Sequence, residues 1–356
     1  MASVALLNAA PSDTLKPGEW YEVPNSQLRA VLPRPIPPGN TGPRALMGAW
    51  SGGAYDTKRE RLIIWGGGHA DYAGNELYVF DLSSLSWSRI WGPSAEIPPI
   101  GAPEEAYPDG NPAARHTYDG LEYIPGIDRF WAQGGALYSG SGGAKNDTWT
   151  FDFEKRVWER KAKSLEDRGS IVSSAYDPVT QHIFVQRYTL FMEYNPMTDI
   201  WTKRGAYDLG FSAQGVGVMD PKRRKFLIIG GGMVWAYDLK QAGRLQLQRL
   251  HTTGDTTIVQ TRYPGVEYDP ITDKIVGWNG GADVYTLDVD TLIWTKHLPA
   301  PTNTVIPGSA ASAGTFGRFR YIPSKNVFIT VSSIDQNVYI YKFSSGKETQ
   351  SFQHKP

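Results

Sequence analysis

The chain repeats one pattern of hydrophobic and polar positions. A run of alternating apolar and polar residues usually ends in Asp, a short turn follows, and a second run contains Trp. The clearest copies are LYVFDLSSLSWSRI from Leu77, TWTFDFEKRVWERK from Thr148, FMEYNPMTDIWTKR from Phe191 and VYTLDVDTLIWTKH from Val284, and weaker copies begin at Val234 and Val338. Because a period of two places apolar residues on one face, each copy predicts two strands joined by a hairpin turn.

Two further strands are predicted before each copy. A turn rich in Pro, Asp, Gly or Asn joins them, as in AYDTKRERLIIW from Ala54 and EYIPGIDRFWAQ from Glu122. Corresponding segments begin at Ala175, Met219, Glu267 and Arg320. The Trp-containing hairpins start 43 to 71 residues apart, which is the spacing of propeller blades. The sequence therefore predicts an all-β fold, a closed six-bladed β-propeller with four-stranded blades.

The details of the repeat resemble those of the kelch family. Glycines end the second strand, an aromatic strand ending in Asp comes next, and Trp follows; NDTWTFD, residues 146–152, is close to the kelch consensus. The glycines are Gly66–Gly68, Gly134–Gly135, Gly230–Gly232 and Gly280–Gly281. The resemblance covers roughly residues 46–344 and implies a kelch-like propeller. It implies no single function, because kelch propellers include enzymes, sugar-binding proteins and protein-binding modules.

The last predicted blade lacks an outer strand of its own. GEWYEVPN, residues 18–25, carries the Trp pattern of the other outer strands and is predicted to close the ring, whereas the alternative, KETQSFQHK near the C-terminus, lacks Trp. We therefore expect a tail at 1–17, one propeller domain at 18–344 and a tail at 345–356. The blades are expected at about 46–93, 115–162, 169–205, 213–250, 263–300 and 315–344.

Composition narrows the class of function. Lys plus Arg and Asp plus Glu both number 36, so no net charge steers the protein toward nucleic acid or an acidic membrane surface. The chain has no Cys, which excludes disulfides, thiolate nucleophiles and the Tyr–Cys cofactor of galactose oxidase, whose central propeller is kelch-like. No apolar run is long enough to insert into a membrane, and the N-terminal segment lacks the features of a secretory signal. An extracellular or virion-associated protein is the favoured interpretation.

The up-and-down order of strands sorts the loops onto two faces. Connectors between the second and third strands share one face with the segments that lead from blade to blade, and the hairpin turns lie on the other. On the first face His69 and His116 depart from the repeat, because no other blade carries His there. Asp71, Tyr72, Asn75, Glu76, Arg115 and Tyr118 accompany them. Candidate substrate-binding residues on this face are Arg168, Arg187, Tyr188, Gln214, Arg262, Tyr263, Asn279, Arg318 and Arg320.

Residues that recur from blade to blade are expected to be structural. The repeated tryptophans should form the core between blades, and the repeated aspartates should cap turns. These sets are Trp20, Trp87, Trp158, Trp201 and Trp294, and Asp81, Asp152, Asp238 and Asp288. The other histidines are expected to be surface or packing residues.

The residues of the first face suggest an acidic, uronate-type polysaccharide as ligand and β-elimination as the reaction. Arginine forks bind carboxylates, aromatic faces pack on sugar rings, and a neutral imidazole can accept a proton. Arg115 would neutralise the carboxylate, His69 or His116 would remove the α-proton, and Tyr72 or Tyr118 would protonate the leaving oxygen. Nearby Arg charge is expected to keep the histidine neutral. The constellation resembles that of propeller-fold ulvan lyases, which place His, Tyr and Arg on one face.

Other functions fit the same face. Kelch-type sialate mutarotases also present Arg to a sugar carboxylate, whereas the chain lacks the S-x-D-x-G-x-x-W box of sialidases. A non-catalytic glycan- or protein-binding propeller, such as a phage virion, tail or cell-surface component, is a further interpretation. No cofactor is required by the sequence, although His69 and His116 with Asp71 or Glu76 would also suit a divalent metal such as zinc, which is the lesser interpretation.

Overall fold

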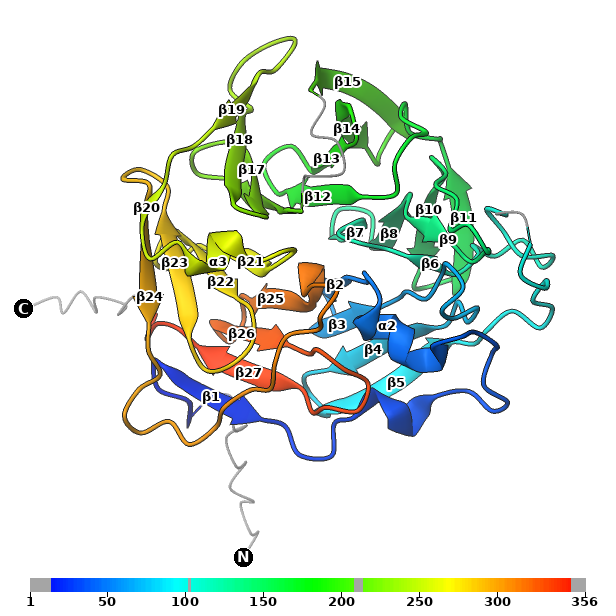
Figure 1. Ribbon diagram of the computed structural model, residues 1–356, viewed down its shortest axis with the longest axis horizontal. Helices are drawn as coiled ribbons and strands as arrows, with labels where there is room; N and C mark the ends of the chain where they lie inside the picture. Colours follow the sequence, from blue (N-terminus) through cyan, green and yellow to red (C-terminus); the bar gives the residue numbers. More distant parts are fainter. Residues whose placement is uncertain (1–13, 102–103, 208–213, 347–356) are drawn as a thin grey trace, which may run out of the picture.

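Six antiparallel sheets surround a central axis in the computed structural model, which describes residues 14–101, 104–207 and 214–346 (Figure 1). Within these residues each sheet forms one blade of a six-bladed propeller. The innermost strands of neighbouring blades contact one another around the axis, which confirms the predicted fold class. No helix in the described ranges has the length and apolar character needed to cross a membrane.

The first three blades follow one another along the chain, and the strands of each run in order from the axis outward. Blade 1 comprises β2 (Gly53–Asp56), β3 (Arg61–Ile64), β4 (Leu77–Asp81) and β5 (Ser86–Trp91). Blade 2 comprises β7 (Leu121–Ile124), β8 (Arg129–Gln133), β10 (Thr148–Asp152) and β11 (Val157–Lys161). Blade 3 comprises β12 (Val172–Asp177), β13 (His182–Arg187), β14 (Leu190–Asn195) and β15 (Ile200–Ala206).

The remaining blades complete the ring. Blade 4 comprises β16 (Val216–Asp220), β17 (Lys225–Gly230), β18 (Met233–Asp238) and β19 (Leu247–Arg249). Blade 5 comprises β21 (Gly265–Asp269), β22 (Lys274–Trp278), β23 (Val284–Asp288) and β24 (Ile293–His297), with β20 (Thr253–Gly254) added in parallel. Blade 6 comprises β25 (Phe319–Ile322), β26 (Val327–Thr330), β27 (Tyr339–Lys342) and, from the start of the chain, β1 (Glu19–Glu22).

Short elements lie between the blades. β6 (Arg115–His116) pairs with β9 (Ala136–Leu137) outside the blade sheets. The short helices are η1 (Leu28–Val31), η2 (Gly42–Arg44), α2 (Ala45–Gly48), α3 (Thr257–Gln260) and η4 (Phe316–Arg318).

The core lies between adjacent blades, because each sheet presents apolar side chains to its neighbours. The five repeating tryptophans are all buried, as predicted. Trp65 of blade 1, for example, packs on Trp158 of blade 2 with ring centroids 5.1 Å apart. The repeated aspartates also behave as expected: Asp152 accepts hydrogen bonds from the backbone N–H groups of Glu154 and Lys155 at 2.9 and 3.0 Å. Side-chain capping of this kind fixes the hairpin turns.

The N-terminal strand closes the ring. β1 pairs with β27 in antiparallel register, from Glu19 opposite Lys342 to Glu22 opposite Tyr339. The buried ring of Trp20 lies 4.6 Å from that of Tyr341, and this packing aligns the strand within blade 6. The alternative closing segment, residues 347–355, lies outside the described residues.

Candidate functional site

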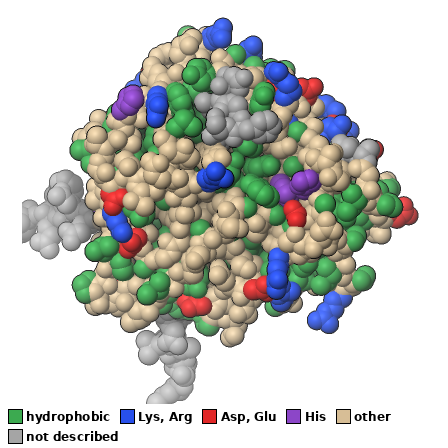
Figure 2. Space-filling model, in the orientation of Figure 1, with side chains coloured by type: hydrophobic (Ala, Val, Ile, Leu, Met, Phe, Trp, Pro, Cys, Tyr) green, Lys and Arg blue, Asp and Glu red, His purple; other side chains and the backbone are tan. Residues whose placement is uncertain are grey.

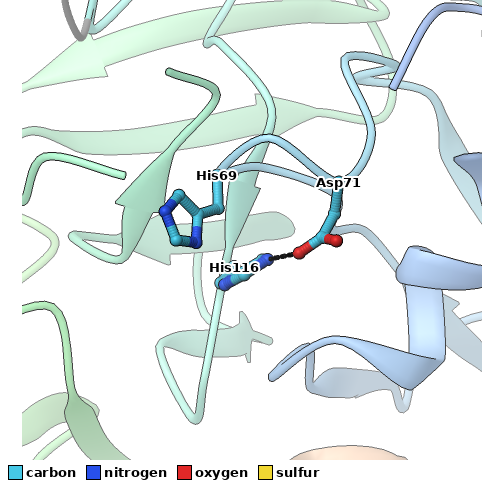
Figure 3. Close-up of side chains that lie close together, drawn as sticks. All are labelled: His69, Asp71 and His116. Atoms are coloured by element: carbon cyan, nitrogen blue, oxygen red, sulfur yellow. Dashed lines mark hydrogen bonds and ion pairs between the residues drawn. The ribbon is translucent and has the colours of Figure 1, made fainter. Parts of the chain in front are cut away.

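The two histidines that depart from the repeat lie next to each other. His69 belongs to the connector between β3 and β4 of blade 1, and His116 ends β6, just before blade 2. Their rings lie edge to face (Figure 3), and the ring centroids are 5.6 Å apart. A shared face and adjacent blades predict this proximity.

Backbone hydrogen bonds attach the connector of blade 1 to blade 2. The N–H of His69 donates to the carbonyl of Leu137 at 3.0 Å, and the N–H of Ser139 donates to the carbonyl of His69 at 2.9 Å. Gly68 permits this approach, since a Cβ there would lie 2.2 Å from the Cα of Arg115. His69 itself has a left-handed φ of 47°, a conformation that residues other than glycine rarely adopt.

Asp71 completes a cluster with the two histidines. Its Oδ2 lies 2.9 Å from Nε2 of His116 (Figure 3). Its Oδ1 accepts a hydrogen bond from the hydroxyl of Thr41. The carbonyl of Asp71 also accepts the N–H groups of Thr41 and Gly42 at 3.0 and 2.9 Å, so the segment before α2 positions the aspartate. One potential metal-binding atom from each of His69, Asp71 and His116 lies within 4.8 Å of the others.

Burial keeps the His116 imidazole unprotonated. Loss of hydration is the main cause that lowers the pKa of His116 to about 4; the neighbouring His69 adds to the shift and Asp71 opposes it. The sequence predicted that arginine charge would have this effect, and that explanation is wrong for His116. A neutral imidazole near pH 7 can accept a proton or bind a metal ion.

Four aromatic residues continue from His116 around the central axis. Trp50, Tyr118, Tyr263 and Phe316 all have left-handed φ angles and lie just before the innermost strands of blades 1, 2, 5 and 6. Ring centroids are 5.4 Å apart between Trp50 and His116, 6.4 Å between His116 and Tyr118, and 4.7 Å between Tyr263 and Phe316. Tyr118 also lies edge to face against Tyr263 at 6.5 Å.

Exposure differs strongly along this aromatic row. Trp50 is 41% exposed and Tyr118 is partly buried, whereas Phe316 is inaccessible. Trp50 and Tyr118 are therefore the two rings of the row that a ligand can contact most readily. Figure 2 shows a histidine and an acidic side chain at the surface near the middle of the view, with hydrophobic side chains around them.

Three of the predicted arginine ligands are buried and donate hydrogen bonds within the protein, although Nη1 and Nη2 of Arg187 have no hydrogen-bond partner. Arg115 donates to Oδ2 of Asp147 at 2.8 Å and to three backbone carbonyls. Arg318 donates to the carbonyls of Ser51, Val331 and Gly314, and Arg187 donates through Nε to the carbonyl of Gly169. All three guanidinium groups face no open surface, and that of Arg318 links blade 6 to the segment that enters blade 1, so we withdraw their assignment as substrate ligands and that of Arg115 as the catalytic cation.

Two other predicted residues also point inward. The hydroxyl of Tyr72 is buried and donates to Oε1 of Glu76 at 2.7 Å, so Tyr72 is not available as an acid. Arg320 lies in the central channel, where Nη1 donates to Oε2 of Glu267 at 3.1 Å and Nη2 lies 3.7 Å from Oε2 of Glu122. These three side chains line a cavity of about 300 Å³ that is bordered by the β2–β3, β7–β8, β12–β13 and β25–β26 turns, on the face opposite the histidines.

The other predicted residues remain accessible to different degrees. Arg262 is exposed beside Tyr263 and forms no ion pair with the described residues. The Arg168 side chain is 64% exposed, pairs with Glu166 and lies over the ring of Tyr188 at 5.4 Å. Gln214, Tyr188 and Asn279 are partly buried. Arg262 is thus the predicted cation that best combines exposure with a place next to the aromatic row.

Sequence reasoning missed Trp50 and Thr41. Trp50 stands just before an innermost strand, outside the repeating Trp position, where blades 2, 5 and 6 carry Tyr118, Tyr263 and Phe316. An aromatic residue recurring at that place was a signal that could have been read. Nothing in the sequence indicated the contact of Thr41 with Asp71.

Comparisons with known proteins support the fold alone. No protein-family model and no curated protein matches the sequence. Similar solved structures include that of YjhT, at 14% identity and a TM-score of 0.51, covering 88% of this chain and 100% of that one. A fungal alcohol oxidase of the AA5 family in complex with copper is 13% identical, with a TM-score of 0.48 over 85% of this chain and 76% of that one.

Proposed function

We propose that this propeller binds an acidic glycan on the face that carries His69, Asp71 and His116, and cleaves it by β-elimination. The observation that carries the proposal is the cluster itself, in which an unprotonated imidazole is held by a carboxylate and faces a second imidazole. The adjacent rings of Trp50 and Tyr118 supply apolar surface of the kind on which sugar rings pack.

The roles in the reaction follow from which side chains remain available. Arg262 takes the place of Arg115 as the arginine that can approach a sugar carboxylate, because Arg262 is exposed. In the metal-free protein, one imidazole of the His69–His116 pair removes the proton α to that carboxylate. The released electron pair forms the C=C bond as the bond between the β-carbon and the glycosidic oxygen breaks.

Tyr118 is the acid for the departing oxygen. Burial raises the pKa of its hydroxyl to about 12, so the group keeps its proton at neutral pH and has one to donate. The ring of Tyr118 lies edge to face against that of His116, with centroids 6.4 Å apart, so the acid and the base are direct neighbours on one face and a sugar residue would lie over both.

A screen of uronate-containing polysaccharides tests the proposal. Cleavage by β-elimination creates a conjugated C=C bond, so ultraviolet absorbance rises with time. Tyr118→Phe should lower kcat by about 100-fold, since a general acid contributes roughly 10²–10⁴. His251→Ala, which changes an exposed histidine elsewhere, should be as active as the unmodified protein.

The outcomes separate the candidate functions. Saturable binding of an acidic glycan without new absorbance would replace the lyase by a binding module, and accelerated anomer exchange of a free sialic acid would favour a mutarotase. If no acidic glycan binds and none is cleaved, the proposal as a whole is refuted. Binding that survives Arg262→Ala and high salt unchanged would remove Arg262 from the carboxylate site.

A further inference from the structure

We propose that His69, Asp71 and His116 bind a divalent transition metal, with zinc as the best match. Two imidazole nitrogens and one carboxylate oxygen form a donor set found in catalytic zinc sites, which keep further positions open for water or substrate. The inference deepens the proposed function, on which its role in the reaction rests, but metal binding itself is independent of any glycan.

The distances allow the three ligands to converge. Their candidate donor atoms lie within 4.8 Å of one another. In a tetrahedral site with bonds of about 2.0–2.2 Å, donor atoms lie roughly 3.3 Å apart. Small side-chain rotations close this difference, because Asp71 and His116 are already 2.9 Å apart at Oδ2 and Nε2.

The hydrogen-bonded pair of His116 and Asp71 does not by itself explain why His69 lies beside it. The His69 ring forms no hydrogen bond with the described residues, yet its backbone adopts a φ of 47° that costs free energy for a histidine. Hydrogen bonds to β9 and its neighbours hold that conformation. A metal shared by both imidazoles would give the His69 ring, which lies edge to face against that of His116, a polar partner.

Supporting contacts of the kind seen around metal ligands are also present. Thr41 donates to the Asp71 oxygen that does not face His116, which orients the carboxylate. Trp50 packs against the His116 ring at 5.4 Å and restricts its rotation. The Asp71 side chain is 25% exposed, so solvent and substrate can reach the cluster from that side.

Bound zinc would change how the site supplies its base. Zinc lowers the pKa of its bound water to near 7, so a hydroxide at the cluster could take the α-proton while the two imidazoles act as ligands. The positive ion would also neutralise the sugar carboxylate, the role that the buried Arg115 does not fill.

Equilibrium dialysis of the full chain against Zn²⁺, with metal analysis of the retained protein, tests the inference without any glycan. One zinc per chain is expected. His69→Ala and Asp71→Asn should each weaken binding at least tenfold, and His251→Ala should leave it unchanged. Thr41→Val should weaken zinc binding by about tenfold, because Thr41 orients Asp71. Loss of a contact that orients a metal ligand typically lowers metal affinity by roughly 10–100-fold. A variant of His116 does not test the site, because His116 is buried and its truncation can also destabilise the fold.

Co²⁺ substitution gives a second readout. Visible d–d bands of a low-coordinate Co²⁺ should appear with the unmodified chain and vanish with His69→Ala, while circular dichroism shows that the variant is folded. No stoichiometric zinc, or full retention of zinc by both His69→Ala and Asp71→Asn, would overturn the metal site. Zinc binding without lyase activity would support the metal site and refute the proposed reaction. Lyase activity that persists after complete chelation would support the reaction and refute a catalytic role for zinc, while the dialysis result still decides whether the metal binds.

Discussion

Removal of the N-terminal strand should destabilise the whole propeller, because residues 18–26 connect three blades. Trp20 of β1 pairs within blade 6, packs on Trp278 of blade 5 at 5.9 Å, and donates through Nε1 to the carbonyl of Ala282 at 3.0 Å. The carbonyl of Ser26 accepts the indole N–H of Trp87 from blade 1 at 2.8 Å. Loss of this segment therefore removes a bridge from blade 5 to blade 1 as well as one strand.

The size of the effect follows from the buried side chains. Trp20 is 3% exposed, and truncation of a buried Trp to Ala costs about 3–5 kcal/mol. Val23 is 1% exposed and contributes roughly 1.5–3 kcal/mol. Deletion of residues 1–26 should thus lower the unfolding free energy by about 5–8 kcal/mol, a large part of the ~5–15 kcal/mol that stabilises a typical protein.

Urea unfolding followed by circular dichroism measures the loss. The single change Trp20→Ala should lower the thermal midpoint by about 4–7 °C, given an unfolding entropy of roughly 2.1 cal/mol/K per residue over 356 residues. Trp50→Ala is the matched control, because Trp50 is 41% exposed and its loss should shift the midpoint far less. An unchanged midpoint in the truncated protein would show that β1 does not stabilise the ring, and would refute its role as a bridge between blades.

Three further predictions concern other residues. Gly68→Ala should weaken zinc binding without changing a ligand, because the new Cβ would force the His69 connector away from β6. Gly281→Ala is the control in the same dialysis, because Gly281 has a similar φ and a Cβ there would have no atom within 4 Å. Arg115→Ala should lower the unfolding free energy by about 3–5 kcal/mol, because the buried Asp147 carboxylate loses its ion-pair partner and keeps only the indole N–H of Trp149. Loss of the exposed Arg168 side chain should cost less than about 1 kcal/mol, and equal effects in urea unfolding would contradict this. Burial raises the pKa of Glu122 to about 7, so the folded state holds a proton that the unfolded state has lost. The free energy of unfolding should therefore fall as pH rises from about 4.5 through 7, by roughly 3 kcal/mol at most. Glu122→Gln should flatten this pH dependence, and parallel curves for the two proteins would disprove the role of Glu122.

Several features of this fold could be predicted because they repeat. Alternation of apolar and polar residues is local, so each hairpin and its capping Asp can be read from a few consecutive residues. Repetition of the hairpin gives the number of blades, and the Trp in residues 18–25 identifies the strand that completes the sixth. The up-and-down order of strands also fixes which loops share a face, which is why His69 and His116 could be expected together.

The orientation of the arginines was decided by tertiary structure. Arg318 donates to Ser51, 267 residues away in the sequence, and Arg115 pairs with Asp147, 32 residues away. A long side chain at the start of a strand can extend outward to solvent or inward to carbonyls of the next blade, and only the assembled ring brings those acceptors within reach. The site depends on the same condition. Asp71 and Trp50 meet His116, and Thr41 meets Asp71, because separate loops converge on one face of the ring, whereas the repeating pattern specifies only the strands between those loops.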